Sequence, residues 1–127
     1  MSVVKSIGGI SIATNNPRSL AEWYAEILGI HVEENTSAEV YCCDFYHRDM
    51  NRPDVVNRTV WTIVPAQDVA SPAVTGFTLS YTVESLDTLL EQLQSKQIDV
   101  EKIEEHDHGR SAWIKDPEGR SIELWED

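Results

Sequence analysis

The side chains best suited to chemistry form a short His-Asp-His sequence near the C-terminus. His106, Asp107 and His108 directly precede Gly109. In extended backbone the two histidines lie on one face, and such a pair is a common arrangement of ligands for a divalent metal ion. The surrounding sequence, EEHDHGR, is strongly polar. An exposed edge or loop without a function is therefore the simpler interpretation of this segment, and a pair that lines a cavity without holding a metal is a third.

Aromatic side chains are a second candidate for function, because the chain contains four tryptophans in 127 residues. Trp23 and Trp125 are expected in the core. Trp61, Tyr81 and Trp113 fall in segments that read as strands, where they line either the core or a pocket. A concave surface lined by such rings suits a flat or apolar small molecule.

Two segments of similar pattern supply the elements that must position these residues. Residues 7–13 and 76–83 alternate apolar with small or polar residues, as half-buried strands do. Each is followed by an apolar stripe of helical period: residues 17–28, which begin at a proline and end before Gly29, and the leucines that follow the predicted N-cap Ser85. Three further strands are expected after each helix, at 30–35, 38–46 and 57–64, and at 98–104, 109–115 and 120–125.

The chain is thus predicted to be one α+β domain, residues 1–127, built from two βαβββ modules whose curved mixed sheets enclose a cavity. Module 1 spans about 1–65 and module 2 about 75–127, joined by a linker at 66–74 that is rich in Pro, Ala and Ser. The polar stretch YHRDMNRPD, residues 46–54, is expected to be a surface loop or a lid over the cavity.

Charge and cysteine content limit the partners and the compartment. The net charge of −12 disfavours nucleic acid and anionic membranes. No apolar run approaches the length of a membrane span, and the first residues lack the apolar region of a signal peptide. The two cysteines, Cys42 and Cys43, are adjacent, and in a strand they point to opposite faces, so a disulfide between them is not expected. A cytoplasmic protein is predicted.

Two motifs carry a resemblance to a known family. SLAEWYAEILGI, residues 19–30, and WIKDPEGRSIELWE, residues 113–126, together with the repeated βαβββ pattern, resemble the vicinal oxygen chelate superfamily of glyoxalases, bleomycin-resistance proteins and dioxygenases. Asp116 to Gly119 are a strong turn signal, and in the strand that follows, Ile122 and Leu124 face one side while Glu123 and Trp125 face the other. The resemblance implies that Glu123 lies on the face that the family uses as its cavity.

The resemblance also locates four positions at which metal-dependent members hold a divalent ion. They fall on Gly9, Trp61, Thr78 and Glu123, of which only the glutamate is a strong ligand. A catalytic metal at these positions is therefore not expected. The alternative is a divalent metal at a relocated site made by His106, His108 and Glu123.

The function that the resemblance implies is binding of a small organic molecule in an aromatic cavity. Glu123 is the expected polar anchor or acid/base group, and the expected ligand-binding residues are Trp61, Thr78, Tyr81, His108, Trp113 and Glu123. The alternative is a metal-dependent lyase, isomerase or dioxygenase of the same superfamily. A homodimer is also expected, because the sheet edges of two such modules need covering.

Overall fold

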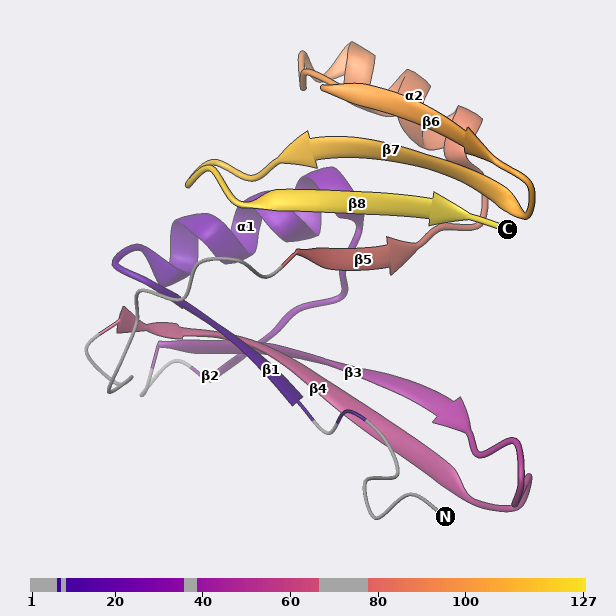
Figure 1. Cartoon of the computed structure of the whole chain (residues 1–127). Helices are drawn as coiled ribbons and strands as arrows, with labels where there is room; N and C mark the ends of the chain where they lie inside the picture. The colour runs from indigo at the N-terminus through magenta and orange to yellow at the C-terminus, as the bar shows by residue number, and fades with distance from the viewer. Residues whose placement is uncertain (1–6, 8, 36–38, 67–77) are drawn as a thin grey trace. The chain divides into compact units, whose positions relative to one another are not determined.

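The computed structural model describes residue 7 and residues 9–35, 39–66 and 78–127 of the chain (Figure 1). The chain divides into two compact units, Met1–Ala73 and Val74–Asp127, which we call unit 1 and unit 2. Apart from residue 66, the predicted linker at 66–74 lies outside the described residues. Each unit contains one helix and a four-stranded mixed sheet, so the predicted βαβββ repeat is confirmed.

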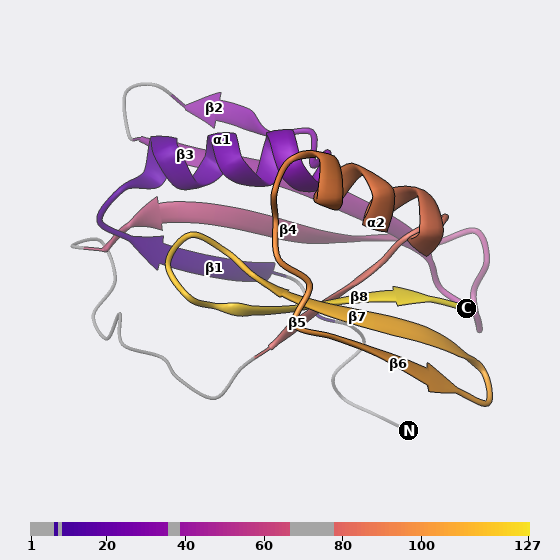
Figure 2. The same cartoon turned by 90° about the horizontal axis from the view of Figure 1, so that it is seen from above.

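In unit 1 the strand order is β1-β4-β3-β2, with β1 parallel to β4 and the other pairs antiparallel. The elements are β1 (Gly9–Thr14), α1 (Pro17–Leu28), β2 (Glu33–Asn35), β3 (Val40–Arg48) and β4 (Val56–Pro65). Helix α1 packs against β1, β3 and β4 and so covers one face of this sheet (Figure 2).

Helix α1 has the limits that its sequence predicts. Pro17 occupies the first turn, where its missing N–H costs nothing, and Gly29 ends the helix in the left-handed conformation with φ 69°. Leu20 and Tyr24 are buried against the sheet. The Tyr24 ring meets the Trp61 ring of β4 edge to face, with 5.2 Å between the ring centroids.

In unit 2 the strand order is β5-β8-β7-β6, the same topology as in unit 1. The elements are β5 (Leu79–Thr82), α2 (Leu86–Ser95), β6 (Lys102–His106), β7 (Gly109–Lys115) and β8 (Ser121–Glu126). Helix α2 contacts β7 and β8. Its apolar stripe, together with the inward side of the sheet, makes a core of fully buried residues: Leu86, Leu93, Ala112, Ile114, Ile122 and Leu124.

Two predicted local signals of unit 2 are confirmed. The Ser85 hydroxyl accepts a hydrogen bond from the Thr88 N–H at 3.3 Å and caps α2. The turn between β7 and β8 is built on Asp116, whose Oδ1 accepts hydrogen bonds from the N–H groups of Glu118 and Arg120. Gly119 occupies this turn with φ 86°.

The structure differs from the sequence-based expectation at two hairpins. Residues 46–48, expected in a loop, belong to β3, which extends to Arg48, and the connection to β4 is confined to residues 49–55. Asp107 and His108 form a turn, so residues 106–108 are not one extended segment. Neither α1 nor α2 is long and apolar enough to cross a membrane, and no other helix that is long enough to do so occurs in the described residues.

Candidate functional site

The second sheet has one face that α2 covers and one that it does not. Leu124 and Ile122 are 0% and 1% exposed against α2, whereas the alternate residues Glu123 and Trp125 are half-buried and point the other way. Register and alternation place the following residues on this second side, which we call the helix-free face of unit 2: Ser80, Thr82, Lys102, Glu104, His106, Ser111, Trp113, Lys115, Ser121, Glu123 and Trp125.

Trp113 lies in the middle of this face and is fixed by two residues of β6. Its Nε1 donates a hydrogen bond to Glu104 Oε1 at 3.0 Å. Lys102 Nζ lies 4.9 Å from the centroid of the ring and 3.5 Å from the same carboxylate oxygen. This cation–π contact and the ion pair hold the indole in place. The indole of Trp113 is therefore held in one orientation, with Lys102 over one face of its ring.

Glu123 stands beside Trp113 in the neighbouring strand. It is the cross-strand partner of Trp113 on β7 and of Ser80 on β5. Its side chain is half-buried, and within the described part of the chain no hydrogen bond or ion pair occupies its carboxylate. A carboxylate in this position is available to accept hydrogen bonds from a bound molecule or to exchange a proton with it.

A second aromatic group lies toward the other end of the same face. The centroids of the His106 and Trp125 rings are 5.6 Å apart. His106 Nε2 lies 3.3 Å from Ser111 Oγ, so the imidazole and the hydroxyl share a hydrogen bond. Trp125 passes over Gly109, where a Cβ atom would come within 2.8 Å of the indole. The glycine thus lets this tryptophan lie flat on the sheet.

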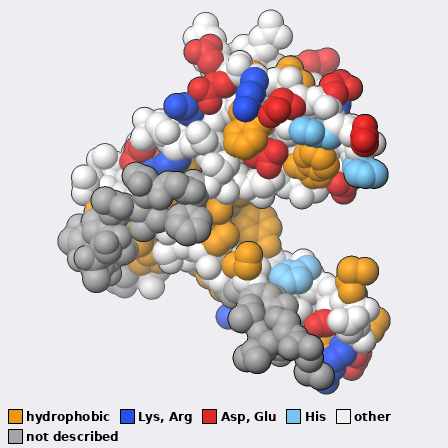
Figure 3. Space-filling model, in the orientation of Figure 1, with side chains coloured by type: hydrophobic (Ala, Val, Ile, Leu, Met, Phe, Trp, Pro, Cys, Tyr) orange, Lys and Arg blue, Asp and Glu red, His pale blue; other side chains and the backbone are white. Residues whose placement is uncertain are grey.

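Figure 3 shows the resulting surface, on which hydrophobic, histidine and acidic side chains of unit 2 alternate. Apolar rings therefore lie next to carboxylates on one side of one sheet. Such a surface fits a ligand with a flat apolar part and a hydrogen-bond donor.

Two of the predicted ligand-binding aromatics lie elsewhere. Trp61 is 2% exposed and packs against Tyr24 under α1, so it belongs to the core, one of the two alternatives that its sequence left open. Tyr81 is paired with Leu124 and faces the side of α2. Trp125, expected in the core, lies on the helix-free face instead. The face therefore contains Trp113 and Trp125 rather than Trp61 and Tyr81.

The His-Asp-His sequence does not form the expected pair. Because the chain turns at Asp107 and His108, His106 belongs to β6 while His108 is exposed in the turn. Among the residues that the structure describes, no three His, Cys, Asp or Glu side chains lie close enough to hold one metal ion. The structure thus does not bring His106, His108 and Glu123 together as one such group.

The four positions that the family resemblance implies do not fit a metal either. Gly9 pairs with Val60, not with Trp61, and these two residues lie on the side of the first sheet that faces away from α1. Thr78 is exposed and directly precedes β5. Glycine has no side-chain ligand atom, the indole of the buried Trp61 cannot act as a ligand, and a hydroxyl is a weak ligand, so Glu123 is the one strong ligand of the set.

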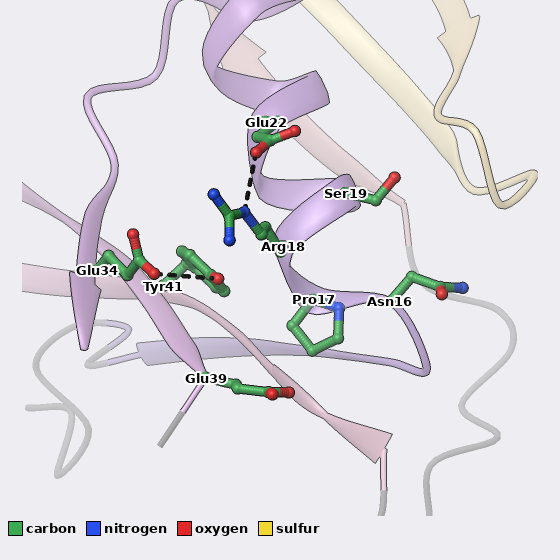
Figure 4. Close-up of a pocket in the computed structure, with 8 residues that line it drawn as sticks. All are labelled: Asn16, Pro17, Arg18, Ser19, Glu22, Glu34, Glu39 and Tyr41. Atoms are coloured by element: carbon green, nitrogen blue, oxygen red, sulfur yellow. Dashed lines mark hydrogen bonds and ion pairs between the residues drawn. The ribbon is translucent and has the colours of Figure 1, made fainter. Parts of the chain in front are cut away.

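A cleft of about 550 Å³ lies in unit 1 (Figure 4). It is lined by the start of α1 and by β2 and β3: Asn16, Pro17, Arg18, Ser19, Glu22, Glu34, Glu39 and Tyr41. Arg18 pairs with Glu22 at 3.2 Å, and the Tyr41 hydroxyl donates a hydrogen bond to Glu34. Burial, and next the charge of Glu34, raise the pKa of Tyr41. Four of the polar side chains of this cleft thus bind one another in two pairs.

Sequence reasoning missed Glu104 and Lys102 as neighbours of Trp113. The two residues are two positions apart in β6 and so lie on the same side of the sheet. Their position beside Trp113 is set by the β6–β7 register, in which Lys102 is opposite Trp113. That register depends on the two-residue turn at Asp107 and His108. A predicted turn there, in place of an extended segment, would have located them.

Comparison with known proteins agrees with this topology. Residues 6–124 match the family model of the Glyoxalase/Bleomycin resistance protein/Dioxygenase superfamily. The structure is similar to that of a lactoylglutathione lyase from Agrobacterium tumefaciens, with a TM-score of 0.71, 15% identity and coverage of 98% of this chain and 96% of that one. It is also similar to an oxidase, with a TM-score of 0.69, 17% identity and coverage of 99% and 95%.

A third similar structure is a virulence protein from Salmonella typhimurium, with a TM-score of 0.73, 12% identity and coverage of 98% of both chains. No curated protein matches the sequence. At these identities the likeness of the solved structures establishes the fold alone, and a lactoylglutathione lyase and an oxidase share that fold.

Proposed function

The chain belongs to the Glyoxalase/Bleomycin resistance protein/Dioxygenase superfamily, and we propose that it binds a small organic molecule on the helix-free face of unit 2. The observation that carries the proposal is the half-buried Glu123 carboxylate directly opposite Trp113. A flat apolar part of the ligand stacks on the indole, while a hydroxyl or cationic group donates a hydrogen bond to Glu123.

Binding in this form does not use a catalytic metal. The family positions carry Gly9, Trp61 and Thr78 besides Glu123, and this donor set is too poor for a transition metal. Glu123 therefore acts as a hydrogen-bond acceptor, and its capacity to take up a proton is the one acid/base function that the face offers.

The test uses the tryptophans of the protein as the reporter. We expect a panel of small aromatic amines and alcohols to contain compounds that quench the indole emission in titrations. For such a compound, Glu123→Gln should weaken binding about 10- to 150-fold, because a charge-assisted hydrogen bond contributes about 1.5 to 3 kcal/mol. Trp113→Leu should weaken it as well.

The matched control is Glu105→Gln, which removes the same charge from β6 on the side that faces away from this surface. It should leave the affinity unchanged. If compounds bind with affinities that neither Glu123→Gln nor Trp113→Leu alters, while circular dichroism shows both variants folded, the ligand site lies elsewhere and the proposal is wrong.

A further inference from the structure

Strand β3 leaves part of one edge without a neighbour in the described sheet. In unit 1 the outer strand β2 pairs with residues 40–42 of β3 only, although β3 continues to Arg48. Figure 1 shows β3 and β4 running on beyond the end of β2 as a two-stranded arm. We call Asp44–Arg48, on the side away from β4, the free edge. All five of its residues are exposed.

The hydrogen-bond pattern shows which backbone groups this edge presents. The Asp49 N–H donates to the Val55 carbonyl at 3.0 Å, across the register in which Arg48 is opposite Val56. In an antiparallel ladder the residues alternate between facing the partner and facing away. The N–H and C=O groups of Asp44, Tyr46 and Arg48 therefore point away from β4.

The side chains along the free edge of one copy are complementary to those along the same edge of a second copy. When two copies of this edge are antiparallel and centred on Tyr46, Asp44 of one copy lies opposite Arg48 of the other, and the reverse pair is equivalent by symmetry. The same register places Phe45 opposite His47. It also aligns the three outward-facing residues of each copy, which allows about six backbone hydrogen bonds between the copies.

The existing contacts of these residues do not prevent such pairing. Asp44 lies 3.6 Å from Arg58 and accepts a hydrogen bond from the Tyr46 hydroxyl, and Arg48 donates to the Pro53 carbonyl. All are exposed side-chain contacts of the kind that contributes little to stability and rearranges readily. Tyr46 is 65% and Phe45 41% exposed, so two large apolar side chains also remain uncovered on this edge.

We propose that the free edge of β3 binds the same edge of a second copy of this chain, antiparallel and centred on Tyr46, so that the two first sheets join into one. The charge pattern favours this occupant, because a strand that pairs here is complementary when it presents a cation opposite Asp44 and an anion opposite Arg48. The chain itself carries that pair at the matching spacing.

The experiment is a charge exchange followed by sedimentation of the full chain. Wild type should sediment at about twice 14.4 kDa. Because residues 44 and 48 meet in two symmetry-related pairs, Asp44→Arg and Arg48→Asp should each put like charges opposite one another in both pairs. Each should weaken dimerisation at least about tenfold. An equimolar mixture of these two variants should form heterodimers, and the double variant Asp44→Arg/Arg48→Asp should form homodimers again.

Two more variants make the outcome specific. Tyr46→Pro removes an N–H that points away from β4, so it should abolish the dimer while the circular dichroism spectrum stays unchanged. Arg52→Asp makes the same charge change as Arg48→Asp, but in the turn beyond the free edge, and it should leave the dimer intact. A wild-type chain that is monomeric at about 100 μM, or a dimer that survives both single exchanges and Tyr46→Pro, overturns the proposal.

Discussion

At the scale of single residues, Glu126 is the side chain that attaches helix α2 to the sheet of unit 2. One of its oxygens accepts a hydrogen bond from the Leu86 N–H at the start of the helix, and the other accepts one from Arg110 of β7. Arg110 also binds Asp87 in the first turn of α2. The Leu86 N–H first and Arg110 second lower the pKa of Glu126 from its usual value of 4.5.

Replacing Glu126 by glutamine should therefore destabilise the protein in a pH-dependent way. The lowered pKa means that the stabilisation is present above pH 4.5 and is lost as the pH falls through the folded-state pKa. Denaturant titrations should show a lower free energy of unfolding for Glu126→Gln at pH 7 and a smaller difference from wild type at pH values below 4.5.

The exposed Glu91 of the same helix provides the control, since Glu91→Gln removes an equal charge without touching either partner. It should leave the unfolding free energy near that of wild type at both pH values. A deficit of Glu126→Gln that is equal at neutral and acid pH would mean that the ionised carboxylate is not what stabilises the helix start.

The faces of two strands were not equally predictable from their residues. In β8 the carboxylate of Glu123 stands between two aliphatic residues. Ile122 and Leu124 therefore identify the core side of the strand, and Glu123 identifies the other side. In β4 both sets of alternate residues mix apolar with polar side chains, and the alternation of Val60 and Trp61 selects neither side. The structure decides through α1, whose Tyr24 packs on Trp61, and a tertiary contact of this kind is not visible in the strand itself.

At the scale of elements, the limits that have a local cause were predictable. Helix α1 begins at Pro17 and ends at Gly29, as expected, because both residues act on their own backbone. The extension of β3 to Arg48 was missed, since the polar sequence of that segment is typical of a loop. Pairing with β4 supplies the hydrogen bonds that keep it extended.

The β6–β7 hairpin and the packing of Trp125 beside it both require a glycine at position 109. A Cβ atom there would clash with the Glu126 carbonyl oxygen and lie 2.8 Å from the Trp125 ring. Gly109→Ala should therefore cost about 1 to 3 kcal/mol of unfolding free energy and change the near-ultraviolet circular dichroism of the tryptophans. Gly9→Ala, whose Cβ would lie 3.3 Å from the Val60 oxygen, is the milder comparison. Equal stability of the two variants would contradict this role of Gly109.

At the scale of the whole molecule, the fold was predictable and the site only in part. The βαβββ repeat follows from a pattern that occurs twice along the chain, so each copy supports the other. The site depends on which side each strand residue takes and on the register of β6, both of which involve contacts between distant segments. Glu123 and Trp113 share a face because β7 and β8 pair in one particular register, with these two residues opposite each other.

The last prediction concerns metal content, which is a property of the whole chain because its family positions come from both units. Gly9 and Trp61 provide no ligand in unit 1, and Glu123 has only Thr78 as a companion in unit 2. A single carboxylate with a weak hydroxyl donor binds a transition metal poorly. Elemental analysis after gel filtration should therefore find far less than one Zn, Ni, Fe or Mn per chain. A content of about one metal per chain that falls on Glu123→Gln would instead place the carboxylate in a metal site and favour metal-dependent chemistry.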